Sequence, residues 1–188
     1  MNQELAQQIL ALAAKDQEKR YHLFNLEHDL NSSQASKQQA RAEIQATDQE
    51  NLIAIRAIFE EHGFPSKSLV GEEASHRFWV LVQHADQDVD FQAEVTADLS
   101  IKCEAGEADV KDYAFLLDRV RVNRAQKQVY GTQVELKADG SAFIPKPLED
   151  PDTVEQRRAQ VGLEPLSKYL IDMNELYSYS LKTSRKTL

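Results

Sequence analysis

The sequence is poor in the features that build disulfide frameworks and membrane spans. It contains one cysteine, Cys103, in 188 residues, so no disulfide can form within the chain. No apolar run approaches the roughly 18 residues needed to cross a bilayer. Residues 1–4 also lack the basic start that precedes the apolar stretch of a secretion signal. We therefore expect a cytoplasmic protein with no membrane partner.

Basic residues are in the minority as well. The chain carries 22 lysines and arginines against 31 aspartates and glutamates, which gives a formal net charge of −9. This excess of negative charge works against a surface that follows a phosphate backbone, so we expect no nucleic-acid partner. The length suits one domain with a sizeable core, and we expect a single domain over residues 1–188.

The most apolar stretch of the chain ends in groups able to do chemistry. Five bulky apolar residues, 78–82, lead directly to Gln83, His84 and Asp86. A segment that is apolar on every side is buried on every side, so these polar groups are expected at the edge of the core. We interpret the run as a buried helix, although periodicity alone also allows a buried strand.

The remaining periodicity predicts a mainly α fold, a bundle of about six or seven helices with one small antiparallel β-hairpin. We expect an N-terminal helical pair at 1–62, central helices at 72–123, the hairpin at 128–145 and C-terminal helices at 150–180. A possible capping box at Thr47–Glu50 leaves open whether the second long helix restarts there. In the hairpin, a first strand over 128–136 precedes a turn at Asp139–Gly140.

Polar residues interrupt the core-facing stripes of the first two helices. Asp16 and Arg20 continue the stripe of Leu5 and Ile9, and Asp48 and Asn51 lie on the core-facing stripe of the second helix. Asp16 and Arg20 are i,i+4 partners. On a stripe that faces the core, they are either a buried structural pair or part of a site.

The segment that ends at Asp86 is the best candidate for catalysis. A carboxylate near an imidazole orients it and raises its basicity, so His84 and Asp86 could act as a general base and its orienting acid. They could equally supply two metal ligands, but no second motif with metal-ligand spacing accompanies them. We therefore favour a site without a metal, keep a metal as the less favoured alternative, and name no cofactor. The acids at 86, 88 and 90 could instead cap the following helix.

Two further groups of polar residues are candidates for ligand binding. Gln128, Tyr130, Thr132 and Gln133 would form a hydrogen-bonding wall beside a strand glycine, unless the strand is simply half exposed. The Asp118–Arg119 pair, together with arginines 157 and 158, would clamp an anionic ligand, unless these are surface ion pairs.

These residues together resemble an uncharacterised bacterial domain family with Gln-His-Ala-Asp and Tyr-Gly-Thr-Gln signatures and no assigned activity. The segments that carry the resemblance are Asp16–Arg20, Gly63–Pro65, Leu69–Gly71, Trp79–Asp86, Phe91–Gln92, Leu117–Val120, Gln128–Gln133, Asp150–Arg158 and Gly162–Leu163. The resemblance implies a set of polar site residues: Asp16, Arg20, Asp48, Asn51, Gln83, His84, Asp86, Asp118, Arg119, Gln128, Tyr130, Thr132, Gln133 and Arg157.

Because buried polar groups are costly unless they satisfy one another, we expect this set to converge on one cluster. Our first hypothesis is a cytosolic hydrolase or transferase that acts by general acid/base catalysis on a small polar or anionic substrate. Its roles would be distributed as base His84, orienting acid Asp86, second acid Asp118, anion clamp Arg119 or Arg20, and recognition wall Gln128, Tyr130 and Gln133. The alternative is a non-catalytic acidic protein of the immunity or inhibitor type that binds a basic partner.

Overall fold

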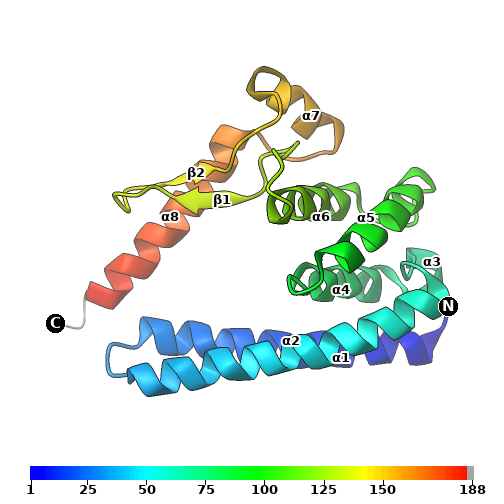
Figure 1. Ribbon diagram of the computed structural model, residues 1–188, viewed down its shortest axis with the longest axis horizontal. Helices are drawn as coiled ribbons and strands as arrows, with labels where there is room; N and C mark the ends of the chain where they lie inside the picture. Colours follow the sequence, from blue (N-terminus) through cyan, green and yellow to red (C-terminus); the bar gives the residue numbers. More distant parts are fainter. Residues whose placement is uncertain (186–188) are drawn as a thin grey trace. The chain divides into compact units, whose positions relative to one another are not determined.

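The computed structural model of the chain describes residues 1–185 and confirms a mainly α fold with a small hairpin (Figure 1). The described residues form eight α-helices, one 3-10 turn and one two-stranded antiparallel sheet. In chain order the elements are α1 (Gln3–His28), α2 (Gln34–His62), α3 (Lys67–Val70), α4 (Glu72–Gln83), α5 (Val89–Glu104), α6 (Val110–Asn123), β1 (Val134–Leu136), β2 (Phe143–Pro145), η1 (Pro151–Thr153), α7 (Val154–Gln160) and α8 (Leu166–Arg185). None of the described helices is both long and apolar enough to cross a membrane.

The chain divides into two compact units. The first comprises Met1–Ala85 with the segment that begins at Ser180, and the second comprises Asp86–Tyr179. The expectation of one domain over residues 1–188 stays a prediction, and each unit is described by itself.

The first unit is built on the long antiparallel pair α1 and α2. Each helix starts at a polar cap, where the Asn2 side chain accepts from the Leu5 amide and the Ser33 side chain accepts from the Ser36 amide. α2 runs without a break through residues 47–50, so the alternative of a restart there is wrong. The core of the unit is apolar and comes from all four helices: Leu5, Ile9, Ala13, Ile55, Ile58, Val70, Phe78, Leu81 and Val82.

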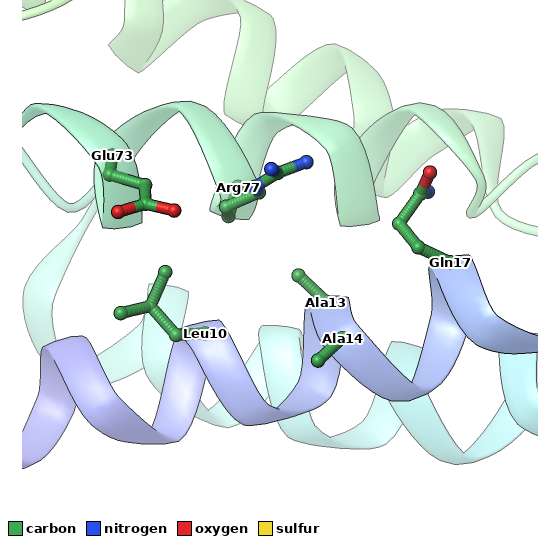
Figure 2. Close-up of a pocket in the computed structure, with 6 residues that line it drawn as sticks. All are labelled: Leu10, Ala13, Ala14, Gln17, Glu73 and Arg77. Carbon is green, nitrogen blue, oxygen red and sulfur yellow. The ribbon is translucent and has the colours of Figure 1, made fainter.

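The apolar run at 78–82 belongs to α4, so the helical interpretation is confirmed and the strand alternative is wrong. Gly71, directly before α4, has a φ of +87°, a backbone conformation that residues with a Cβ rarely adopt. Phe78 is fully buried and meets Phe64 edge to face, with ring centroids 5.6 Å apart. α4 packs on both α1 and α2. Between α1 and α4 lies a pocket of about 320 Å³ (Figure 2).

The second unit begins with the antiparallel neighbours α5 and α6. The Asp88 side chain caps α5 by accepting from the Phe91 amide, so the capping role foreseen for this run of acids is confirmed at Asp88. The sheet pairs Val134 with Pro145 and Leu136 with Phe143. The hairpin is therefore present but shorter than predicted. Residues 129–133, expected to belong to its first strand over 128–136, form an irregular loop, whose cause is described below, and Gln128 forms only an isolated bridge with Leu148.

Candidate acid/base site

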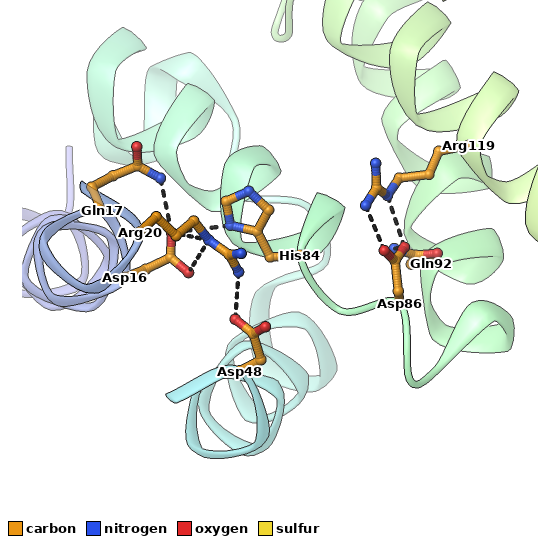
Figure 3. Close-up of polar contacts among 8 residues, drawn as sticks. All are labelled: Asp16, Gln17, Arg20, Asp48, His84, Asp86, Gln92 and Arg119. Carbon is orange, nitrogen blue, oxygen red and sulfur yellow. Dashed lines mark hydrogen bonds and ion pairs between the residues drawn. The ribbon is translucent and has the colours of Figure 1, made fainter. Parts of the chain in front are cut away.

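The first unit holds a partly buried cluster of charged side chains centred on Asp16 (Figure 3). Asp16 projects from the core face of α1 and is only 1% exposed. Its carboxylate lies 3.0 Å from Nδ1 of His84 and accepts from Nε of Arg20 at 3.1 Å and from Nε2 of Gln17 at 2.8 Å. Helix periodicity explains the Arg20 contact, because residues four apart share a helix face. The His84 contact depends on the packing of α4 against α1.

Arg20 connects Asp16 to a second carboxylate. Its Nη2 atom donates to Oδ1 of Asp48, on α2, at 2.5 Å. Burial raises the pKa of Asp48, and Arg20 only partly opposes this effect. One turn further along α2, Asn51 is 4% exposed, and its Nδ2 atom has no hydrogen-bond partner among the described residues. A buried amide without a partner is rare and is frequently found where a ligand or water binds.

The geometry fixes the tautomer of His84. Burial alone would raise the pKa of Asp16, but the hydrogen bond and charge of His84, with Arg20 and Gln17, outweigh it, and the pKa lies below its ordinary value. Asp16 is therefore a carboxylate near neutral pH and can only accept hydrogen bonds, so Nδ1 of His84 carries a proton. In the neutral imidazole, Nε2 then holds the lone pair of a general base.

His84 is also accessible. It is the C-cap of α4, just beyond the last helical residue, and its side chain is 24% exposed. Among the described residues, Nε2 of His84 has no hydrogen-bond partner. The imidazole is thus held by Asp16 on one side while its basic nitrogen stays available.

The carboxylate that orients His84 is Asp16 and not the expected Asp86, which belongs to the second unit. Asp86 is held there by a bidentate pair with Arg119, at 2.7 and 2.5 Å (Figure 3). It also accepts from Nδ2 of Asn123 at 2.9 Å. Burial alone would raise the pKa of Asp86, but Arg119, with Gln92 and Asn123, brings it below its ordinary value. Asp86 and Arg119, which were given separate roles as orienting acid and anion clamp, therefore form an ion pair with each other.

Asp118, the expected second acid, is fully buried on α6 and bonds to the backbone of the loop at 128–133. It accepts from the amides of Val129 at 2.7 Å, Tyr130 at 3.1 Å and Thr132 at 3.0 Å, and from the Thr132 hydroxyl at 3.0 Å. A backbone amide that donates to a side chain cannot also donate to a neighbouring strand. This explains why the predicted strand does not form before Val134.

Several other backbone groups of this loop also bond to side chains. Gln128 is fully buried, and its amide bonds to the backbone of Gln133 in both directions and to the Lys146 carbonyl. Arg157 donates to the Val129 carbonyl at 2.8 Å, and Arg158, 2% exposed, donates to the Tyr130 carbonyl at 2.7 Å. These contacts give Asp118, Gln128 and Arg157 a structural role in holding the loop, and the catalytic and binding roles expected of them stay predictions.

The predicted site residues are thus divided between the two units. Those of the first unit are Asp16, Arg20, Asp48, Asn51, Gln83 and His84, and those of the second are Asp86, Asp118, Arg119, Gln128, Tyr130, Thr132, Gln133 and Arg157. Tyr130 is half buried, which raises the pKa of its phenol, and Gln133 donates to the Thr132 hydroxyl at 3.1 Å. Convergence of all these residues on one cluster stays a prediction.

Three residues were not predicted from the sequence: Gln17, which bonds to Asp16, and Glu73 and Arg77, which line the pocket between α1 and α4. Two signals were available. Gln17 is adjacent to Asp16, and Arg77 lies seven residues before His84, a spacing of two helical turns. Within the described part of the chain, no three histidine, cysteine, aspartate or glutamate side chains are placed to hold a metal ion.

Comparison with known proteins gives one finding. Neither the curated proteins nor the solved structures contain a match to the chain. A family model does match residues 3–183, which is nearly the whole length, and its description is a family of unknown function, DUF6624. The match agrees with the resemblance of the sequence to an uncharacterised domain family. The chain therefore belongs to the family of unknown function DUF6624.

Proposed function

We propose that this protein is a cytosolic enzyme, a hydrolase or transferase, that acts by general acid/base catalysis on a small polar or anionic substrate with His84 as the base. One observation carries the proposal. The buried Asp16 carboxylate holds Nδ1 of His84 at 3.0 Å, while Nε2 faces no partner among the described residues. A base held in one tautomer by a carboxylate is a recurrent catalytic arrangement.

Arg20 supplies a positive charge beside this base. It is fixed between Asp16 and Asp48, yet its side chain is 29% exposed, and Nη1 bonds to none of the described residues. A guanidinium that is positioned in advance can hold an anionic group of a substrate or the negative charge that develops in a transition state. In this proposal His84 takes up the proton, Asp16 orients His84 and stabilises the imidazolium, and Arg20 is the anion clamp.

The test is a comparison of His84→Gln with the wild type on a panel of small substrates. The panel contains the 4-nitrophenyl derivatives of acetate, phosphate and a phosphodiester, together with an aminoacyl 4-nitroanilide. We expect the wild type to act on at least one of them and His84→Gln to lower kcat/KM by about 10²–10⁴-fold, the usual contribution of a positioned base.

The matched control is His22→Gln, because His22 is an exposed histidine of α1 outside the Asp16 cluster. This variant is expected to retain wild-type rates, and circular dichroism checks that all proteins are folded. If the wild type acts on no member of the panel, or if His84→Gln is as active as the wild type, the proposal is wrong.

The alternative proposal is a non-catalytic acidic protein that binds a basic partner. A specific feature of α1 favours it. Tyr21 and Phe24 are 65% and 49% exposed on an acidic protein, and their ring centroids lie 6.4 Å apart, with the Phe24 ring also against His28. Exposed aromatic side chains of this type often anchor interfaces. Under this alternative, Tyr21→Ser with Phe24→Ser weakens partner binding, whereas His84→Gln does not.

A further inference from the structure

The pocket between α1 and α4 has the dimensions of a small-ligand site. Its volume of about 320 Å³ is at the lower end of the range for ligand pockets, so it suits a molecule of few atoms. The residues that line it are Leu10, Ala13, Ala14 and Gln17 of α1 and Glu73 and Arg77 of α4 (Figure 2). All of them lie within the first unit.

Two opposite charges of this pocket are left without partners. Glu73 and Arg77 stand one helical turn apart in the order that favours an ion pair. Nevertheless, neither side chain forms a hydrogen bond or ion pair with any described residue. In Figure 2 the Glu73 carboxylate points toward Leu10, and the Arg77 guanidinium extends away from it in the direction of Gln17. In a chain of net charge −9, an arginine without an acidic partner needs an explanation.

We infer that this pocket binds a small zwitterion with an apolar side chain, an amino acid or a dipeptide. The carboxylate of the ligand bonds to Arg77, whose planar guanidinium suits bidentate recognition of a carboxylate. Its ammonium group is attracted to Glu73. Its apolar part covers the side chains of Leu10 and Ala14, which would otherwise face water, beside the buried Ala13.

The pocket is linked to the candidate acid/base site by two features. Gln17 lines the pocket and also donates from Nε2 to Asp16 at 2.8 Å. Along α4, His84 follows Arg77 by two helical turns, on the same side of the helix. The further assignment of this ligand as the substrate rests on the proposed function, whereas its binding does not.

The experiment is calorimetric titration of the full chain with three matched probes. These are alanyl-leucine, N-acetyl-alanyl-leucine, which lacks the ammonium group, and alanyl-leucine amide, which lacks the carboxylate. We expect the wild type to bind alanyl-leucine about tenfold more tightly than either capped form, the loss that corresponds to one charge-assisted hydrogen bond. Arg77→Met should remove the preference against the amide, and Glu73→Gln should remove the preference against the acetylated form.

The controls separate this inference from the proposed function. Arg41→Met, which removes an exposed arginine paired with Glu27, should bind as the wild type does. Arg77→Lys, which keeps the charge without the planar fork, should retain part of the affinity. His84→Gln should bind alanyl-leucine with unchanged Kd. Equal affinity for the three probes, no detectable binding by the wild type, or unaltered selectivity in Arg77→Met overturns the inference. Selective binding with no loss of activity in His84→Gln contradicts the proposed function alone.

Discussion

Asp16 and Asp118 are both aspartates buried on a helix, with exposed fractions of 1% and 0%, but their partners differ in kind. Asp16 bonds to the side chains of His84, Arg20 and Gln17, whereas Asp118 bonds to three backbone amides and one hydroxyl of a single loop. A backbone amide cannot change its charge, so the contacts of Asp118 fix a chain path. An imidazole can gain or lose a proton, so the contacts of Asp16 set a state of protonation.

The comparison shows that burial alone does not identify a catalytic carboxylate. Both aspartates are costly to bury and are fully satisfied, and either would be selected by a search for buried acids. What distinguishes Asp16 is a titratable partner whose other nitrogen remains available. Three experiments test this distinction.

The largest effect is expected for Asp118→Ala. It leaves three amides and a hydroxyl of the loop without their acceptor, and it should lower the free energy of unfolding by about 3–5 kcal/mol. Urea unfolding gives the total, and hydrogen exchange should show lost protection at Val129, Tyr130 and Thr132. Asp152→Asn, an exposed acid of η1, is the control and should change stability by less than about 0.5 kcal/mol. A loss of activity in Asp118→Ala without a loss of stability would reverse the roles of the two aspartates.

A smaller and pH-dependent effect is expected for Asp16→Asn. Because the pKa of Asp16 is lowered in the folded protein, the unfolded chain takes up the proton first as the pH falls. The stabilisation by this carboxylate is therefore complete above about pH 4 and is lost as the pH falls through the folded pKa. Asp16→Asn should lower the free energy of unfolding at pH 7 by about 1–3 kcal/mol.

The measurement is urea unfolding of wild type and variant between pH 7 and pH 3. The difference between them should shrink toward acidic pH. Asp48 is the internal contrast, because burial raises its pKa and its ionisation therefore costs stability as the pH rises. A difference between wild type and Asp16→Asn that is the same at every pH would mean that the contacts of Asp16 do not depend on its charge.

The smallest expected effect is a difference of about 1 kcal/mol between two glycine variants, which tests how rigidly the loop bound by Asp118 is held. Gly131 has φ +73°, and a Cβ there would lie 3.0 Å from Cδ1 of Leu166, so Gly131→Ala adds a contact to the cost of the left-handed backbone. We expect a loss of about 2 kcal/mol. Gly140 has nearly the same φ, +70°, with nothing within 4 Å of such a Cβ, and Gly140→Ala should cost only about 1 kcal/mol. The measurement is the Tm of each variant. An equal decrease in Tm for both would show that the Leu166 side chain moves aside at little cost.

The helices were predictable because their signals are local. The periodicity of α1, α2 and α4 repeats within a few residues, and the break at 29–33 and the end of α2 before Gly63 are marked by capping residues. The first strand of the hairpin was predicted too long for the same reason. The alternation of residue types over 128–133 is typical of a strand. The side chains that bond to the backbone of this segment, Asp118 and the two arginines, lie 11 to 28 residues away in the sequence, so the local pattern could not indicate them.

The partner of His84 was wrongly predicted because proximity in sequence favoured Asp86. Asp16 is 68 residues from His84 along the chain, and only the packing of α4 on α1 brings them together. The helical stripe did place Asp16 and Arg20 on the core face of the first helix. What a single sequence could not give was the pairing of that face with the end of α4, since periodicity says which side of a helix is buried and not which element covers it.

The side chains that hold the loop at 128–133 bond mostly to its backbone, and this has a consequence for divergence within the family. Backbone amides and carbonyls are common to nearly all residues. Asp118, Arg157 and Arg158 can therefore hold the loop in the same shape when other side chains replace those of Val129 and Tyr130. The constraint on the loop's shape thus lies in residues outside it. Members of the family can therefore differ in the side chains of this loop while the conformation of its backbone stays the same.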